Sequence, residues 1–241
     1  MSKRAHRNKS TLIILALILL VPGFLYIAVN RLGFNEYASL PVFGEKTLSG
    51  EMKRNWGRAY PDTIFHMVPH VHFEEVSNTK VMFPAPDTCI SVAHLFYTRD
   101  VAFSRLMLDH VDMLATRFQE NPIVNFFSIS VDSMDTQADV SAFIEPYKNM
   151  AQKHWNVVYS PSVDIFTYAR EELLIDAMPD PTDSTRFLIS NQLVLLDSKG
   201  RIRGFYDISL KGEVDRLEDE IKLLAVEEIR NKPLKVEKKP S

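Results

Sequence analysis

Alternation between apolar and polar positions predicts a βαβ unit in the middle of the chain. Two runs are almost wholly apolar, 90–97 (ISVAHLFY) and 123–131 (IVNFFSISV), which is typical of strands buried on both faces of a sheet. Between them, over residues 100–118, apolar residues recur every three or four positions and predict a helix with one buried face. Two strands joined through a helix lie parallel in one sheet.

Weaker patterns complete one α/β domain around this unit. Ahead of it we expect edge strands, and behind it two helices, a short strand, a loop, a hairpin and a closing helix. In chain order these elements are strands 64–73 and 81–83, a helix over 136–150 that is capped by Asp135 or Thr136 and kinked or split at Pro146, strand 157–159, helix 163–174, loop 178–184, strands 186–196 and 201–206, and helix 214–224. This order predicts a thioredoxin-like sandwich, with a central mixed sheet flanked by helices.

The N-terminal part of the chain predicts a membrane anchor. Residues 11–29 contain no charge over 19 positions, and about 28 Å of helix would nearly match the hydrocarbon core. Four basic residues precede the run, at Lys3, Arg4, Arg7 and Lys9, which favours a cytoplasmic N-terminus. We therefore expect a cytoplasmic segment 1–10, a transmembrane helix 11–30, an irregular tether 31–61, the domain 62–230 in the periplasm, and a basic disordered tail 231–241. A cleaved signal peptide is the alternative.

Composition excludes several classes of function. Hydrophobic residues make up 46% of the chain and charged residues 24%, which is ordinary for a globular protein. The formal net charge of −3 gives no basic surplus for nucleic acid. Cys89 is the single cysteine, so the chain has no internal disulfide and no Cys-x-x-Cys redox centre.

Four segments resemble the SCO/SenC family of membrane-anchored thioredoxin-fold proteins. They are residues 62–69, beginning DTIFH, then LFYTRDVAFSRLM at 95–107, SISVDSMDT at 128–136 and LVLLDSKGRIRGFYD at 193–207. The resemblance covers residues 62–228. It implies an anchored thioredoxin-like domain that takes part in copper delivery and thiol handling for cytochrome c oxidase assembly.

The family's metal ligands are replaced in this sequence. The resemblance implies a Cys-x-x-x-Cys pair after the central strand and a histidine before the closing hairpin, which together bind copper. Asp100 and Ser104 stand at the cysteine positions, and Ile189 stands at or next to the histidine position. Soft sulfur ligands suit Cu(I), whereas an aspartate, a serine and an isoleucine do not form such a site. We therefore expect no cofactor.

Other residues offer different chemistry. Asp100 either caps the helix that follows it or acts with Ser104 as an acid or hard-metal ligand, and we favour the cap. His66, His70 and His72 have the spacing to share one strand face, where they would bind Cu(II), Zn or Ni. Cys89 is interpreted as a small buried residue, with a thiol enzyme as the alternative.

These observations predict an accessory protein rather than an enzyme. We expect a non-catalytic SCO/SenC-like factor in the assembly of respiratory oxidases and their copper sites. Its expected partners are the membrane and either oxidase subunits or an intact SCO-like paralogue. The alternatives are a metal-binding protein using the three histidines and an enzyme that depends on Cys89.

Overall fold

The computed structural model divides the chain into two units, 1–38 and 39–241. It describes residues 14–18, 20–26, 39–55, 58–77, 79–86, 89–159, 163–183 and 185–231. In the first unit, residues 14–18 and 20–26 are helical. Within the described part of the chain, no helix is both long and apolar enough to cross a membrane. The predicted cytoplasmic segment 1–10, the part of the predicted tether before residue 39 and the tail beyond residue 231 lie outside the described residues.

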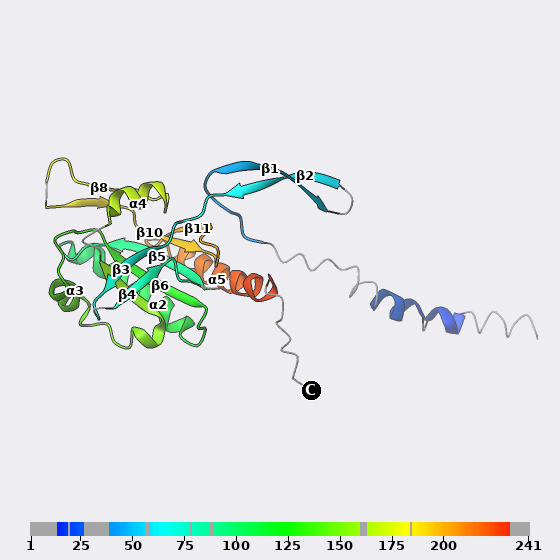
Figure 1. The fold of residues 1–241 in the computed structure, drawn as a ribbon. Helices are drawn as coiled ribbons and strands as arrows, with labels where there is room; N and C mark the ends of the chain where they lie inside the picture. The colour runs from blue at the N-terminus through cyan, green and yellow to red at the C-terminus, as the bar shows by residue number, and fades with distance from the viewer. Residues whose placement is uncertain are drawn as a thin grey trace, which may run out of the picture. The chain divides into compact units, whose positions relative to one another are not determined.

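The second unit is built on a seven-stranded mixed sheet (Figure 1). The strand order is β11-β10-β5-β6-β7-β3-β4. The pairs β5–β6 and β6–β7 are parallel, and all other neighbouring pairs in this sheet are antiparallel. The strands are β3 (Val71–Glu75), β4 (Lys80–Phe83), β5 (Ile90–Phe96), β6 (Val124–Ser130), β7 (Trp155–Tyr159), β10 (Gln192–Leu196) and β11 (Ile202–Asp207).

Helices cover both faces of this sheet. They are α2 (Val101–Phe118), α3 (Gln137–Ile144), the short 3₁₀ helix η1 (Ala151–Lys153), α4 (Ile165–Glu171) and α5 (Lys211–Asn231). Side chains of β5 alternate between the two resulting cores. Val92 and Phe96 pack with α2 and α5 on one face, while Ala93 and Leu95 pack with α4 on the other. The thioredoxin-like sandwich predicted from the element order is therefore confirmed.

Of the two caps predicted for α3, the structure uses Thr136, which forms a reciprocal capping box with Asp139. The helix ends at Ile144, two residues before Pro146, where the sequence predicts a break. The strands that follow need correction. The predicted strand 186–196 is two strands, and the predicted loop 178–184 begins within a strand. These strands are β8 (Ala177–Pro179) and β9 (Phe187–Ile189), which form a separate two-stranded sheet.

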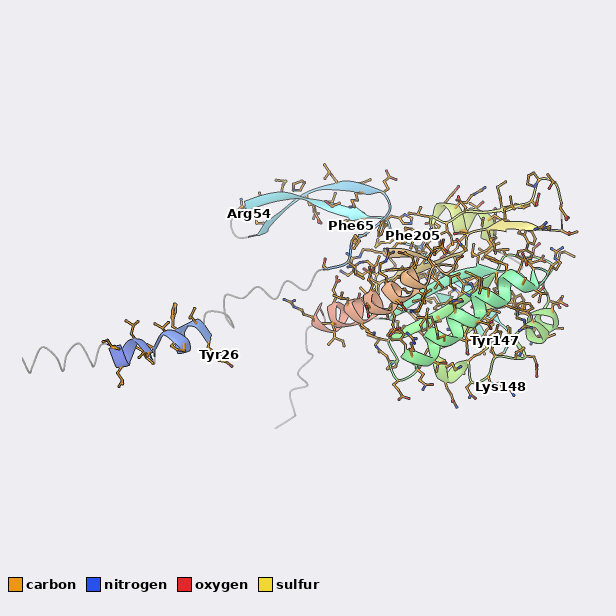
Figure 2. All side chains as sticks on the ribbon, turned by 180° about the vertical axis from the view of Figure 1, so that it is seen from behind. Tyr26, Arg54, Phe65, Tyr147, Lys148 and Phe205 are labelled. Carbon is orange, nitrogen blue, oxygen red and sulfur yellow. The ribbon has the colours of Figure 1, made fainter. Side chains whose placement is uncertain are left out.

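The irregular tether predicted up to residue 61 is wrong in its second half. Strands β1 (Lys46–Asn55) and β2 (Arg58–Phe65) form an antiparallel ribbon separate from the main sheet. The predicted domain boundary at 62 therefore falls inside β2. Gly50, with φ of +79°, lies at the register shift of β1, and Pro61 is tolerated because each strand has an open edge. Figure 2 shows Phe65 at one end of the ribbon and Arg54 at the far end.

The chain entering this ribbon is fixed to β11 and α5. The buried guanidinium of Arg203 donates to the carbonyl oxygens of Leu40 at 2.7 Å and Pro41 at 3.1 Å. The same group pairs with Asp197 at 3.1 Å and with Glu227 at 2.8 Å. Residues near the N-terminal end of the second unit are thereby joined to its core.

Candidate functional site

The turn between β5 and α2 is held by hydrogen bonds from its own polar residues. Asp100 is the N-cap of α2, and its Oδ1 accepts from the Phe103 N–H at 3.2 Å. The Tyr97 hydroxyl donates to the second carboxylate oxygen of Asp100 at 3.4 Å. Burial, followed by the charge of Asp100, raises the pKa of Tyr97. The cap predicted for Asp100 is confirmed.

Ser104 lies one turn into α2 and is fully buried. Its hydroxyl donates to the Tyr97 carbonyl at 2.7 Å, and its oxygen accepts from the Tyr97 N–H at 3.2 Å. The described hydrogen bonds thus direct Ser104 to the backbone of β5, not to the Asp100 carboxylate. The structure does not form the acid–hydroxyl pair considered from the sequence.

Two further aspartates connect this turn to the one after β6. Asp132 forms a salt bridge with Arg99 at 2.6 Å, and the carboxylate is 2% exposed. Asp135 accepts from Thr98 and Ser130, each at 2.6 Å. Burial raises the pKa of Asp135. These bonds fix the carboxyl ends of the two parallel strands, as expected for turn-shaping residues.

An aromatic contact brings β9 to the same turn. The Phe187 ring meets the Tyr97 ring edge-on, with centroids 5.1 Å apart, and packs against Phe166 at 5.5 Å. The guanidinium of Arg99 lies over the Phe187 ring, 5.3 Å from its centroid. Ile189 follows two residues later on β9 and is half-buried.

A pocket of about 670 Å³ lies where α2 and β9 meet. Phe103, between the two replaced cysteine positions, and Ile189, at the replaced histidine position, both line it. Of the three positions singled out by the family resemblance, Ile189 therefore lines the pocket itself, and Asp100 and Ser104 flank the lining residue Phe103 in the sequence. Its remaining lining residues come from α4, β8 and β9 or adjoin them: Arg170, Asp176, Ala177, Met178, Leu188, Ser190 and Asn191.

Sequence reasoning did not foresee this pocket, because its walls come from segments far apart in the chain. The sequence predicts lost ligands at 100, 104 and 189 and a helix cap at Asp100, but it does not predict a cavity next to them. One feature of the sequence does point to an apolar pocket. Phe103 and Ile189 place apolar side chains at or beside the positions where the family resemblance implies copper ligands.

The three candidate histidines do not share a strand face. His66 follows the end of β2, and its Nε2–H donates to the Glu172 carbonyl at 2.8 Å. His70 lies in the segment before β3, and its Nδ1–H donates to the Pro84 carbonyl at 3.0 Å. Only His72 lies within a strand, where it is exposed. Among the described residues, no group of three His, Cys, Asp or Glu side chains is placed to hold a metal ion.

The remaining candidates belong to the core or its margin. Cys89 is partly buried and packs against the core cluster on the α4 face, just before β5. His94 is buried in β5, where its Nε2 lies 2.6 Å from the Ser128 hydroxyl, which also accepts from Trp155 at 2.9 Å. Burial lowers the pKa of His94 to about 4, so the ring is neutral at pH 7.

The donor set at 100, 104 and 189 does not fit copper. The carboxylate of Asp100 and the hydroxyl of Ser104 are hard oxygen groups already used in helix capping and backbone bonding. Ile189 has no donor atom. Soft thiolate and imidazole ligands, which Cu(I) prefers, are absent from these three positions.

Comparison with known proteins identifies the fold. Neither protein-family models nor curated proteins match the chain. An SCO1/SenC family lipoprotein from Bacillus anthracis has 18% sequence identity, over 66% of this chain and 95% of its own, with a TM-score of 0.58. BsSco, a member of the Sco family of cytochrome c oxidase assembly proteins, has 18% identity, over 67% of this chain and 94% of its own, with a TM-score of 0.57. Yeast Sco1 has 13% identity, over 65% of this chain and 98% of its own, with a TM-score of 0.50.

These likenesses confirm, at the level of the fold, the family resemblance inferred from four segments of sequence. The second unit has the thioredoxin-like fold of SCO/SenC proteins, and it spans almost the whole length of these neighbours.

Proposed function

We propose that this chain is a divergent SCO/SenC protein that acts as a non-catalytic accessory factor in assembling a respiratory oxidase or its copper site. A helix over residues 11–30 anchors it in the cytoplasmic membrane, with the domain on the periplasmic side. The uncharged run at 11–29 and the basic residues before it support this topology. BsSco belongs to a family of cytochrome c oxidase assembly proteins, and the similar fold of this chain supports a role in oxidase assembly.

One observation carries the non-catalytic role. The scaffold around the family's ligand positions is intact, yet each of those positions has a structural task. Asp100 caps α2, Ser104 binds the backbone of Tyr97, and Ile189 lines an apolar pocket. Such a site has neither the thiols for disulfide exchange nor the soft donors for Cu(I).

A copper titration tests the loss of the metal site. The full chain, in lipid nanodiscs, is titrated with Cu(I) against a competing chelator, beside the triple variant Asp100→Cys, Ser104→Cys, Ile189→His. We expect no stoichiometric binding by the natural chain and one Cu(I) bound by the triple variant. One tightly bound Cu(I) in the natural chain would contradict the proposal. His66→Ala, His70→Ala and His72→Ala together would then show whether those histidines bind it.

Co-purification tests the accessory role. The tagged chain is cross-linked in its native membranes. The control is a fusion protein in which an unrelated domain follows residues 1–45 in place of the rest of the chain. We expect the natural chain, and not the control, to recover oxidase subunits, a copper protein or an SCO-like protein. Recovery of none of these would lead us to abandon the role.

A further inference from the structure

The pocket between α2 and β9 has the composition of a binding site for apolar groups. Phe103, Ala177, Met178, Leu188 and Ile189 supply apolar surface, and the volume of about 670 Å³ lies within the roughly 300–1,000 Å³ common for ligand sites. Met178 and Leu188 are direct partners across β8 and β9, so they lie side by side on one face. They remain 44% and 48% exposed, which is unusual for an adjacent pair of large apolar side chains.

The backbone beside this pocket has a strand edge that is open at Ile189, between Phe187, whose backbone bonds to the Tyr97 hydroxyl, and Asn191, whose carbonyl accepts from the Ile208 N–H at 3.1 Å. Among the described strands, β9 pairs only with β8. The Ser190 N–H donates to the Asp176 carbonyl at 2.9 Å, and the Asp180 N–H donates to the Arg186 carbonyl at 3.0 Å. Because hydrogen-bonded pairs alternate along an antiparallel ladder, the N–H and C=O of Ile189 point away from β8. An open donor and acceptor therefore border the apolar pocket.

Two charges of opposite sign complete the lining. Arg170 at the end of α4 and Asp176 just before β8 are both exposed and both line the pocket. A strongly anionic or strongly cationic ligand would be repelled by one of them. The complementary ligand carries an acidic group facing Arg170 and a basic group facing Asp176.

We propose that this pocket binds an extended segment of a partner protein, which adds to the open edge of β9 and places apolar side chains in the pocket. Strand addition of this kind draws affinity from main-chain hydrogen bonds and specificity from pockets that receive alternate side chains. The segment has two apolar residues separated by one position, with an acidic residue on one flank and a basic residue on the other. The proposal rests on the accessory role proposed above and names the surface through which that role is exerted.

A peptide selection tests this site without any knowledge of the natural partner. A displayed library of random linear peptides is selected on the full chain in nanodiscs and counter-selected on the variant Met178→Asp, Leu188→Asp. Both side chains are exposed, so the variant should keep the fold. We expect enriched peptides with apolar residues at alternate positions and flanking charges of both signs. Synthetic copies should bind the variant at least tenfold more weakly, and Leu48→Asp, on the distant ribbon, should leave binding unchanged.

Two further arms separate strand addition from simple apolar contact. N-methylation of the peptide amides that face β9 should weaken binding at least tenfold, and methylation of the alternate amides should not. Arg170→Glu should weaken binding tenfold, and replacing the peptide's acidic residue by lysine should restore it.

Three results would overturn the proposal. They are selected peptides that lack the alternating pattern, peptides that bind both proteins equally, and a pocket that takes small apolar molecules but no peptide. The co-purification experiment is independent of these arms. Partner recovery without peptide binding would reject this site alone, and peptide binding without recovery of an oxidase-related partner would reject the assembly role.

Discussion

Ser104 and Tyr97 exchange two hydrogen bonds that connect the first turn of α2 to the end of the central strand. The serine hydroxyl donates to the Tyr97 carbonyl at 2.7 Å, and its oxygen accepts from the Tyr97 N–H at 3.2 Å. Ser104 is fully buried, so water cannot replace either bond. A position that the family resemblance assigns to metal binding is used here to stabilise the backbone.

Replacing Ser104 should therefore affect stability. In Ser104→Ala the buried N–H and C=O of Tyr97 lose their side-chain partner, and we expect roughly 1–3 kcal/mol less free energy of unfolding. Urea denaturation of the full chain in detergent micelles measures this loss. Ser209→Ala, which removes an exposed hydroxyl that accepts from Asn191, is the matched control and should change little. Equal stability of the Ser104→Ala and natural proteins would contradict the structural role.

Asp100 should behave as a helix cap and not as a catalytic acid. Asp100→Ala removes the acceptor for the Phe103 N–H and should cost about 1 kcal/mol, whereas Asp100→Asn retains a capping oxygen and should cost much less. Thermal unfolding of the three proteins measures the difference. If the asparagine variant were as unstable as the alanine variant, the carboxylate charge and not the cap would be the important feature.

His94 should make stability depend on pH in a defined window. An unfolded histidine takes up a proton near pH 6.5, but burial lowers the pKa of His94 to about 4 in the fold. Between these values the unfolded state binds the extra proton. The contribution of the neutral ring is thus complete above pH 6.5 and declines toward pH 4, by up to about 3 kcal/mol.

The variant His94→Phe isolates this contribution. It has no imidazole to protonate, so its free energy of unfolding should fall less steeply between pH 6.5 and 4 than that of the natural chain. Urea titrations at several pH values measure both slopes. Parallel slopes would show that the loss of stability toward pH 4 comes from groups other than His94.

Arg203 should be the most costly charged residue to remove from the hairpin region. Arg203→Met removes a charged partner from Glu227 and from Asp197, which keeps its ion pair with Arg201, and loss of a buried partner typically costs roughly 3–5 kcal/mol. Arg216→Met is the control, because that side chain is 47% exposed and its ion pairs should contribute less than about 1 kcal/mol. Denaturant midpoints of both variants give the comparison, and similar losses would contradict the assigned importance of burial.

The central elements could be predicted because their periodicity was unambiguous. The run 90–97 became β5, buried at every position, and the predicted helix 100–118 begins one residue later because Asp100 is its cap. The ribbon β1–β2 was missed because Pro61 and Gly50 interrupt its alternation, and no burial on one face imposes a clear pattern.

The site was only partly predictable for a different reason. The family resemblance identified positions 100, 104 and 189, but their hydrogen bonds and the pocket depend on chain segments far apart in sequence. The histidine prediction failed because it assumed a continuous strand through residues 66–72. Strand β2 ends at Phe65 and β3 begins at Val71, so the even spacing of the histidines has no structural meaning.

The fastening of Leu40 and Pro41 by Arg203 has a mechanical consequence. The Phe43 N–H also bonds to the Ile202 carbonyl at 2.9 Å, so three points of attachment precede the ribbon. After the ribbon, the Val68 N–H bonds to the Gly200 carbonyl at 2.8 Å. A pulling force applied through the N-terminal segment is therefore carried by these bonds to β11 and α5. The ribbon β1–β2 lies between the two sets of attachments and does not bear that force.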